Sequence, residues 1–207
     1  MTGSGTLDGS MQTPPPAIPA RTADREDWRR VLHAASAVLG PLALRLPGYG
    51  GTIALAALAG LALVLEATRH TIPSVQRAVG NLGRAVFRPG EERGISGATA
   101  LAFGYLATWG LFDARSAAAA IVVGGLADPA AALVGSRWGR QGGKSMAGSA
   151  ACAGTAAVTL LACGYSAAPA LMGGVVAAVA ERAPWRGADN VLVPLAVGGA
   201  LSMLGLR

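Results

Sequence analysis

Residues 46–65 read LPGYGGTIALAALAGLALVL, which is 20 consecutive positions without a formal charge. A helix needs about 20 mostly apolar residues to cross the hydrocarbon of a bilayer. Other stretches are similarly poor in charge: residues 31–44, 94–112, 145–180 and 190–206 carry none, and residues 116–136 carry only Asp128. Because residues 145–180 are long enough for two tight spans, the pattern predicts an all-α, polytopic membrane helix bundle of about seven transmembrane helices.

The composition agrees with a membrane protein and excludes several other classes. Of the 207 residues, 52% are hydrophobic and only 14% are charged, whereas about 25% of residues are charged in typical soluble domains. So apolar a chain is not disordered over most of its length. Its two Cys residues are too few for a disulfide scaffold or a four-ligand zinc site.

The chain is expected to have two parts. Residues 1–27 are rich in Gly, Ser, Thr and Pro and lack the apolar segment of a signal peptide, so they predict a disordered cytoplasmic tail. Residues 28–207 are expected to form one integral membrane domain.

The basic residues predict how this domain is oriented. If the N-terminus is cytoplasmic, 14 of the 17 Lys and Arg residues fall in cytoplasmic segments, and the exceptions are Arg45, Arg115 and Arg207. Loops rich in Lys and Arg lie on the cytoplasmic side of multi-pass proteins, so the N-terminus is expected inside. This topology, with contact to anionic lipid, explains the pI near 10.3 without nucleic acid as a partner.

Asp128 is the clearest candidate for a functional residue. It is the one formal charge in residues 116–136, and it lies between Gly124-Gly125 and Pro129. An ionisable residue inside a membrane span marks a functional site by default. The alternative is an Asp that caps a helix at a proline break.

The loop that follows has the residues of a phosphate site. Arg137, Arg140 and Lys144 supply donors, and a helix is expected to begin near Ser145, where its free N–H groups favour an anion. It is not a Walker A motif, because Trp138 stands where that motif requires Gly. The alternative is an ordinary positively charged cytoplasmic loop.

Other polar residues fall near the same face under this topology. Asp189 and Asn190 would either cap the last helix or ligate Mg²⁺, which prefers hard oxygen ligands. Each of the others also has an unremarkable interpretation: Glu91 beside Arg88 as a solvated ion pair, Glu66 and Arg69 as a snorkelling pair, and His33 as an interfacial histidine.

Five short motifs, in order over roughly residues 29–199, carry a resemblance to a known family. They are Arg29-Arg30-Val31-Leu32-His33, Arg88-Pro89-Gly90-Glu91 with Gly97-Ala98-Thr99, ADPAAALVGSRWG at 127–139, KSMAGS at 144–149, and Glu181 with DNVLVPL at 189–195. The set resembles the motifs of the CTP-dependent lipid-alcohol kinases, which are dolichol kinase, phytol kinase and the CTP-using diacylglycerol kinase. The last two motifs match this family's K-S-x-x-G-S and E-x(7)-D-N-x-x-x-P-L.

The resemblance implies an enzyme that uses CTP and Mg²⁺, or another divalent cation, to phosphorylate the hydroxyl of a membrane lipid alcohol at the cytoplasmic face. The alcohol would be polyprenol- or dolichol-like, diacylglycerol or phytol-like. The implied catalytic residues are Asp128, as general base or Mg²⁺ ligand, and Lys144. The implied nucleotide-binding residues are Arg137, Gly139, Lys144, Ser145, Gly148 and Asn190; the implied metal ligands are Asp128, Glu181 and Asp189; and further candidates are His33, Arg88 and Glu91.

The chain departs from the family pattern at a few positions, and two other functions stay open. Ala127 replaces the usual Gly before Asp128, Pro129 follows it, and Ala132 replaces an acidic residue common in phytol kinases. The related phosphatidate cytidylyltransferase is the first alternative, although its G-H-G-G and D-R-x-D segments are missing. The second is a small non-catalytic carrier whose Asp128 binds a cation or proton.

Overall fold

The computed structural model describes residues 20–75, 77–78, 94–138, 144–183 and 188–204, with side chains from residue 27 onward. Within these ranges the chain is all-α, as the sequence predicts, and contains no strand. The elements are α1 (Ala20–Ala35), η1 (Ser36–Val38), α2 (Leu39–Arg45), α3 (Gly50–Thr71), α5 (Gly97–Leu111), α6 (Ala114–Trp138), α7 (Met146–Ala162), α8 (Ala167–Glu181) and α9 (Asp189–Met203).

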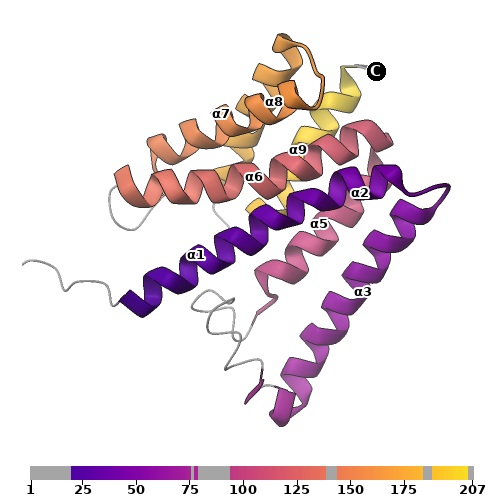
Figure 1. Cartoon of the computed structure of the whole chain (residues 1–207), viewed down its shortest axis with the longest axis vertical. Helices are drawn as coiled ribbons and strands as arrows, with labels where there is room; N and C mark the ends of the chain where they lie inside the picture. The colour runs from indigo at the N-terminus through magenta and orange to yellow at the C-terminus, as the bar shows by residue number, and fades with distance from the viewer. Residues whose placement is uncertain (1–19, 76, 79–93, 139–143, 184–187, 205–207) are drawn as a thin grey trace, which may run out of the picture.

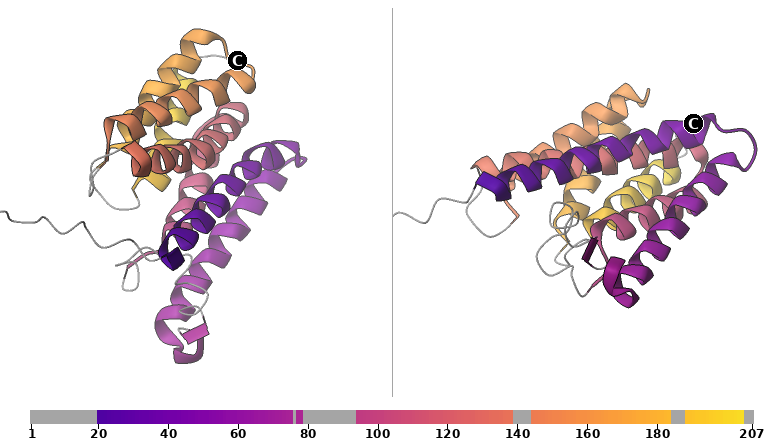
Figure 2. Two further views of the ribbon diagram at one scale, coloured as in Figure 1. Left: turned by 60° about the vertical axis from the view of Figure 1, so that its left-hand side comes forward. Right: turned by 60° about the horizontal axis from the view of Figure 1, so that its bottom comes forward.

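The first three elements continue one another as a single rod (Figure 1 and Figure 2). The backbone stays right-handed helical at Ala35, Val38 and Leu39, where each element passes into the next. The rod therefore contains the predicted span 31–44 and extends it toward the N-terminus. Its helix begins at Ala20, inside the segment predicted as the tail.

Every predicted span coincides with a helical segment, and successive segments run in opposite directions. At one end of the bundle, Glu66 of α3 contacts Thr99 of α5, and Lys144 before α7 contacts Glu181 of α8. At the other end, Trp109 of α5 contacts Thr52 of α3. We call the first end, toward the left and bottom of Figure 1, the polar end, and the second the opposite end.

The core is built around α6 from small side chains. Residues Ala117, Ala118, Ala119, Ala120 and Ile121 are all at most 5% exposed. Such residues let helix backbones approach closely. At Gly125, an added Cβ would lie 2.8 Å from the backbone N, Cα and Cβ of Ala37, so only glycine allows this approach of the first rod to α6.

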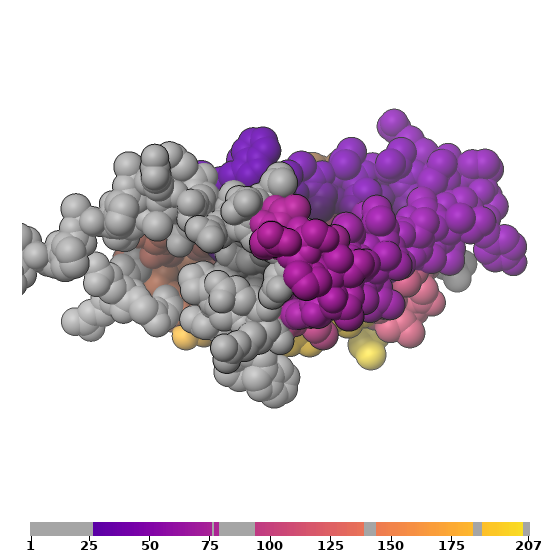
Figure 3. Space-filling model, turned by 90° about the horizontal axis from the view of Figure 1, so that it is seen from below, coloured from indigo at the N-terminus to yellow at the C-terminus, as the bar shows by residue number. Residues whose placement is uncertain are grey.

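The outer surface of the bundle carries many large apolar side chains. By length and composition, α3 and α6 are the two described helices able to cross a membrane, while α7, α8 and α9 are apolar but shorter. In the apolar window of α3 only 22% of residues are buried, against 67% in that of α6. Atoms of the region from α1 to α3, in indigo to magenta, form most of the coloured part of the face in Figure 3.

Candidate functional site

Two buried carboxylates share one lysine at the polar end. Lys144 precedes α7, Glu181 ends α8 and Asp189 begins α9. The Lys144 Nζ lies 3.7 Å from Glu181 Oε1 and 3.7 Å from Asp189 Oδ2, and it also donates to the Glu181 backbone carbonyl. Both acidic residues are buried, whereas the lysine side chain is 34% exposed. The fold thus brings together three predicted site residues that are distant in sequence.

Glu181 is oriented by residues that were not predicted as part of the site. The Ser149 hydroxyl donates to Glu181 Oε2 at 3.2 Å, and Arg182 Nη1 donates to the Ser149 Oγ at 3.2 Å. Ser149 is the final residue of the KSMAGS motif, so this motif could have identified it as a residue of the site. These contacts direct the other oxygen of Glu181 toward Lys144.

Ser145 and Gly148 build the start of α7 beside α6. The helix begins near Ser145, as predicted: Ser145 is its N-cap, and the Ser145 Oγ accepts a hydrogen bond from the Gly148 backbone N at 3.0 Å. A Cβ at Gly148 would lie 2.9 Å from the Ala131 carbonyl oxygen. These two residues therefore fix the position from which Lys144 extends.

Asn190 joins this group to α5. Its Nδ2 donates to the Gly97 carbonyl at 2.8 Å, and its backbone N donates to Asp189 Oδ1 at 3.1 Å. Asn190 is only 7% exposed, and its Oδ1 has no hydrogen-bond partner in the described part of the chain. A buried carbonyl oxygen beside Asp189 is a hard donor that a cation or nucleotide group could satisfy.

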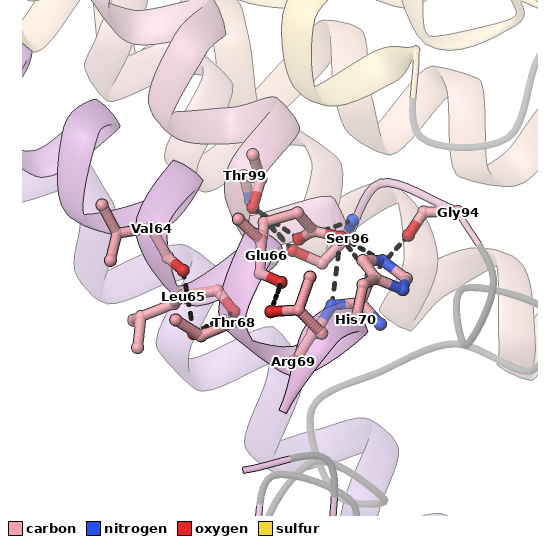
Figure 4. A network of polar contacts seen from close by, with 11 residues as sticks. Val64, Leu65, Glu66, Thr68, Arg69, His70, Gly94, Ser96 and Thr99 are labelled. Atoms are coloured by element: carbon pink, nitrogen blue, oxygen red, sulfur yellow. Dashed lines mark hydrogen bonds and ion pairs between the residues drawn. The ribbon is translucent and has the colours of Figure 1, made fainter. Parts of the chain in front are cut away.

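A second polar network lies next to Gly97 and is centred on Glu66 (Figure 4). Glu66 Oε1 accepts from Arg69 Nε at 3.0 Å, and Oε2 accepts from the Thr99 hydroxyl at 2.8 Å and from the Ser96 backbone N at 3.3 Å. Arg69 also donates to the Gly94 carbonyl. Glu66 and Arg69 are 8% and 7% exposed, so the interpretation as a snorkelling pair was wrong.

These contacts form one polar layer across the polar end, from α3 through α5 and α9 to α8 and α7. Its members are Glu66, Arg69, Ser96, Thr99, Asn190, Asp189, Lys144, Glu181, Ser149 and Arg182.

Asp128 lies deeper in the bundle, paired with His33. The Asp128 Oδ2 is 3.3 Å from the His33 Nδ1, and the two side chains are 12% and 13% exposed. Asp128 falls inside α6, which continues through Pro129 to Trp138. The interpretation of Asp128 as a helix cap was therefore wrong, because the helix neither begins nor ends there.

His33 is itself supported by two hydroxyl groups. The Ser36 Oγ donates to the His33 carbonyl at 2.6 Å and lies 2.9 Å from the Tyr105 hydroxyl. Tyr105, on α5, is completely buried. Ser36 thus connects the backbone at His33 to α5.

The predicted metal ligands do not form one cluster. Within the described ranges, no three His, Cys, Asp or Glu side chains form a group that could hold a metal ion. Of the predicted metal ligands, Glu181 and Asp189 flank Lys144, and Asp128 contacts His33 instead.

The remaining predicted residues are either exposed or not described. Arg137 is exposed in the last turn of α6. Gly139, Arg88 and Glu91 lie outside the described residues.

The opposite end holds a small polar group of a different kind. Asp113, between α5 and α6, accepts hydrogen bonds from the Ser116 backbone N and the Ser202 hydroxyl, each at 3.0 Å. Burial alone raises the pKa of Asp113, but these hydrogen bonds outweigh it and hold the pKa below its usual value. The group connects the start of α6 to the end of α9.

The family resemblance rests on the short motifs quoted above. Comparisons of the chain with models of protein families, with curated proteins and with solved structures found no match.

Proposed function

We propose that the chain is an integral membrane enzyme that transfers the terminal phosphate of CTP to the hydroxyl of a lipid alcohol at the cytoplasmic face. The observation that carries the proposal is Lys144 between two buried carboxylates, in a polar layer at one end of the bundle. A lysine beside hard oxygen ligands is suited to bind nucleotide phosphate together with a divalent cation.

Membrane insertion is supported by the outer surface. Ile53, Leu61 and Val64 on α3 are between 57% and 66% exposed, and contiguous apolar surface of this kind needs a lipid or protein partner. Seven alternating helical segments would cross the bilayer with the N-terminus in the cytoplasm. The polar end then faces the cytoplasm, in agreement with the basic residues Arg69, Arg137, Lys144 and Arg182 located there.

The donor set fits a divalent cation bound together with phosphate. Glu181, Asp189 and the unpartnered Oδ1 of Asn190 are the hard oxygens available, and Mg²⁺ commonly takes one or two carboxylates plus substrate phosphates. When bound, the cation would neutralise charge on the phosphates. Lys144 would bind a phosphate oxygen through its ammonium group, and the network around Ser149 would keep Glu181 in place.

Asp128 would accept the proton of the lipid hydroxyl. The hydroxyl oxygen forms a bond to the γ-phosphorus of CTP, the bond from that phosphorus to the bridging oxygen breaks, and CDP leaves. Asp128 lies 10 residues before Trp138, the end of α6, or about 15 Å along the helix. At that depth the apolar core around it would exclude water from the reacting groups.

The test uses membranes or liposomes containing the chain, Mg²⁺, and CTP or ATP labelled at the γ-phosphate, with CTP labelled at the α-phosphate in parallel so that transfer of CMP is also detected. Acceptors are a polyprenol, a diacylglycerol, phytol and phosphatidate. Labelled lipid phosphate from CTP, lost in Asp128→Asn and Lys144→Gln, is the expected result. CDP-lipid made from phosphatidate would favour the cytidylyltransferase instead, and substrate flux without nucleotide turnover would favour the carrier. Either of these two results would refute the kinase.

A further inference from the structure

We infer that His33 is a positioning residue for Asp128, so that the first helical rod completes the site. The imidazole would hold the Asp128 carboxylate in the orientation that accepts the proton of the lipid hydroxyl. This inference rests on the proposed kinase function and adds a residue and a helix to it.

The first observation is the geometry of the pair. The His33 Nδ1 lies 3.3 Å from Asp128 Oδ2, and about seven-eighths of each side chain is buried. Burial of a carboxylate is unfavourable unless polar groups satisfy it. A histidine from another helix therefore fixes where the carboxylate points, and the side-chain conformation of Asp128 depends on the position of α1.

The second observation is that His33 is held in place from its own side. Ser36 Oγ donates to the His33 backbone carbonyl at 2.6 Å and lies 2.9 Å from the hydroxyl of buried Tyr105. The turn that carries the imidazole is thereby tied to α5. The chain of contacts runs from Tyr105 through Ser36 and His33 to Asp128.

The third observation is the close helix contact one turn away. Gly125 precedes Asp128 by three residues on α6, and Ala37 follows His33 by four on the first rod, so the two pairs lie on matching faces. A Cβ at Gly125 would lie 2.8 Å from three atoms of Ala37. The separation of the helices, and with it the His33–Asp128 distance, is therefore set by a contact without spare room.

The test compares side chains that place a donor N–H at different positions. Asn puts its amide nitrogen near the location of His Nδ1, whereas Gln puts it near that of Nε2. We expect His33→Ala to lower kcat by about 10- to 100-fold, as misplacement of a reacting group does, with KM for CTP unchanged. His33→Asn should recover most of the lost kcat, and His33→Gln should recover little.

The control is His70→Ala, which removes the chain's other histidine from a different carboxylate contact, 3.3 Å from Glu66 Oε1. In a chain that also carries His70→Ala, the differences in kcat among the His33 variants should be the same as without it. Thermal unfolding of each variant identifies loss of fold, and the Asn–Gln comparison remains informative if His33→Ala does not fold.

The outcomes separate this inference from the function on which it rests. Suppose that the wild-type chain transfers phosphate, that Asp128→Asn abolishes the activity and that His33→Ala keeps full kcat. This set of results would overturn the positioning role of His33 and leave the kinase function intact. Equal activity of the Asn and Gln variants, or a change in KM for CTP alone, would also overturn it. A wild-type chain without phosphate transfer would refute the kinase, and the inference with it.

Discussion

Gly125→Ala is the substitution that tests most directly how the first rod packs against α6. The added Cβ would lie 2.8 Å from the N, Cα and Cβ of Ala37, whereas carbon atoms in contact are normally about 3.5–4.0 Å apart. The rod must therefore move by about 1 Å. Overpacking of this kind typically costs about 1–3 kcal/mol, and the better helix propensity of Ala recovers at most about 1 kcal/mol.

The matched control is Gly154→Ala on α7, where an added Cβ meets no atom within 4 Å. Both substitutions gain the same helix propensity, so the difference between them isolates the steric effect. We expect Gly125→Ala to be less stable than Gly154→Ala by about 1–3 kcal/mol, measured as the free energy of unfolding in detergent micelles. Equal stability of the two variants would refute the close packing of the rod on α6. The same shift should also lower kcat, because it moves His33 relative to Asp128.

Three further predictions concern the ends of the bundle. Glu66→Gln leaves the buried Arg69 without its carboxylate and should destabilise the fold by about 3–5 kcal/mol. Thermal unfolding in micelles measures this change. A loss of less than about 1 kcal/mol would contradict the buried network. Lys144→Gln leaves the carboxylates of Glu181 and Asp189 without the ammonium between them and should lower stability by about 1–3 kcal/mol, whereas Lys144→Arg should retain most of it. The pKa of Asp113 is lowered in the folded chain, so its ionised carboxylate should stabilise the fold at pH values above its unfolded-state pKa of 3.8. This stabilisation should be lost as the pH falls below 3.8 through the folded-state pKa. Asp113→Asn should therefore flatten the acid side of the curve of stability against pH.

The helices could be predicted from the sequence because each apolar helix leaves an uncharged stretch of about its own length between charged residues. The six charge-poor stretches, of which residues 145–180 hold two helices, coincide with the helical segments, and α7 begins near Ser145 as expected. The convergence of Lys144, Glu181 and Asp189 also follows, since alternating helices bring the loops after every second span to the same end. For these features local pattern and topology were sufficient.

The partners of buried charges could not be predicted in the same way. Glu66 and Arg69 are three residues apart, and that spacing is the same for an exposed pair and for a buried one. Their burial depends on Ser96 and Thr99, which are about 30 residues further along the chain. Likewise, His33 at a predicted helix start gave no indication that it faces Asp128, because only the packing of the first rod on α6 decides this.

The unequal lengths of the helices have a consequence for the surrounding lipid. At about 1.5 Å per residue, the 22 residues of α3 reach about 33 Å, while the 15 residues of α8 and α9 reach only about 22 Å. A typical hydrocarbon layer is about 30 Å thick, so a bilayer around this chain would match α3 and would have to thin beside α8 and α9. The headgroups on that flank would be drawn toward the midplane.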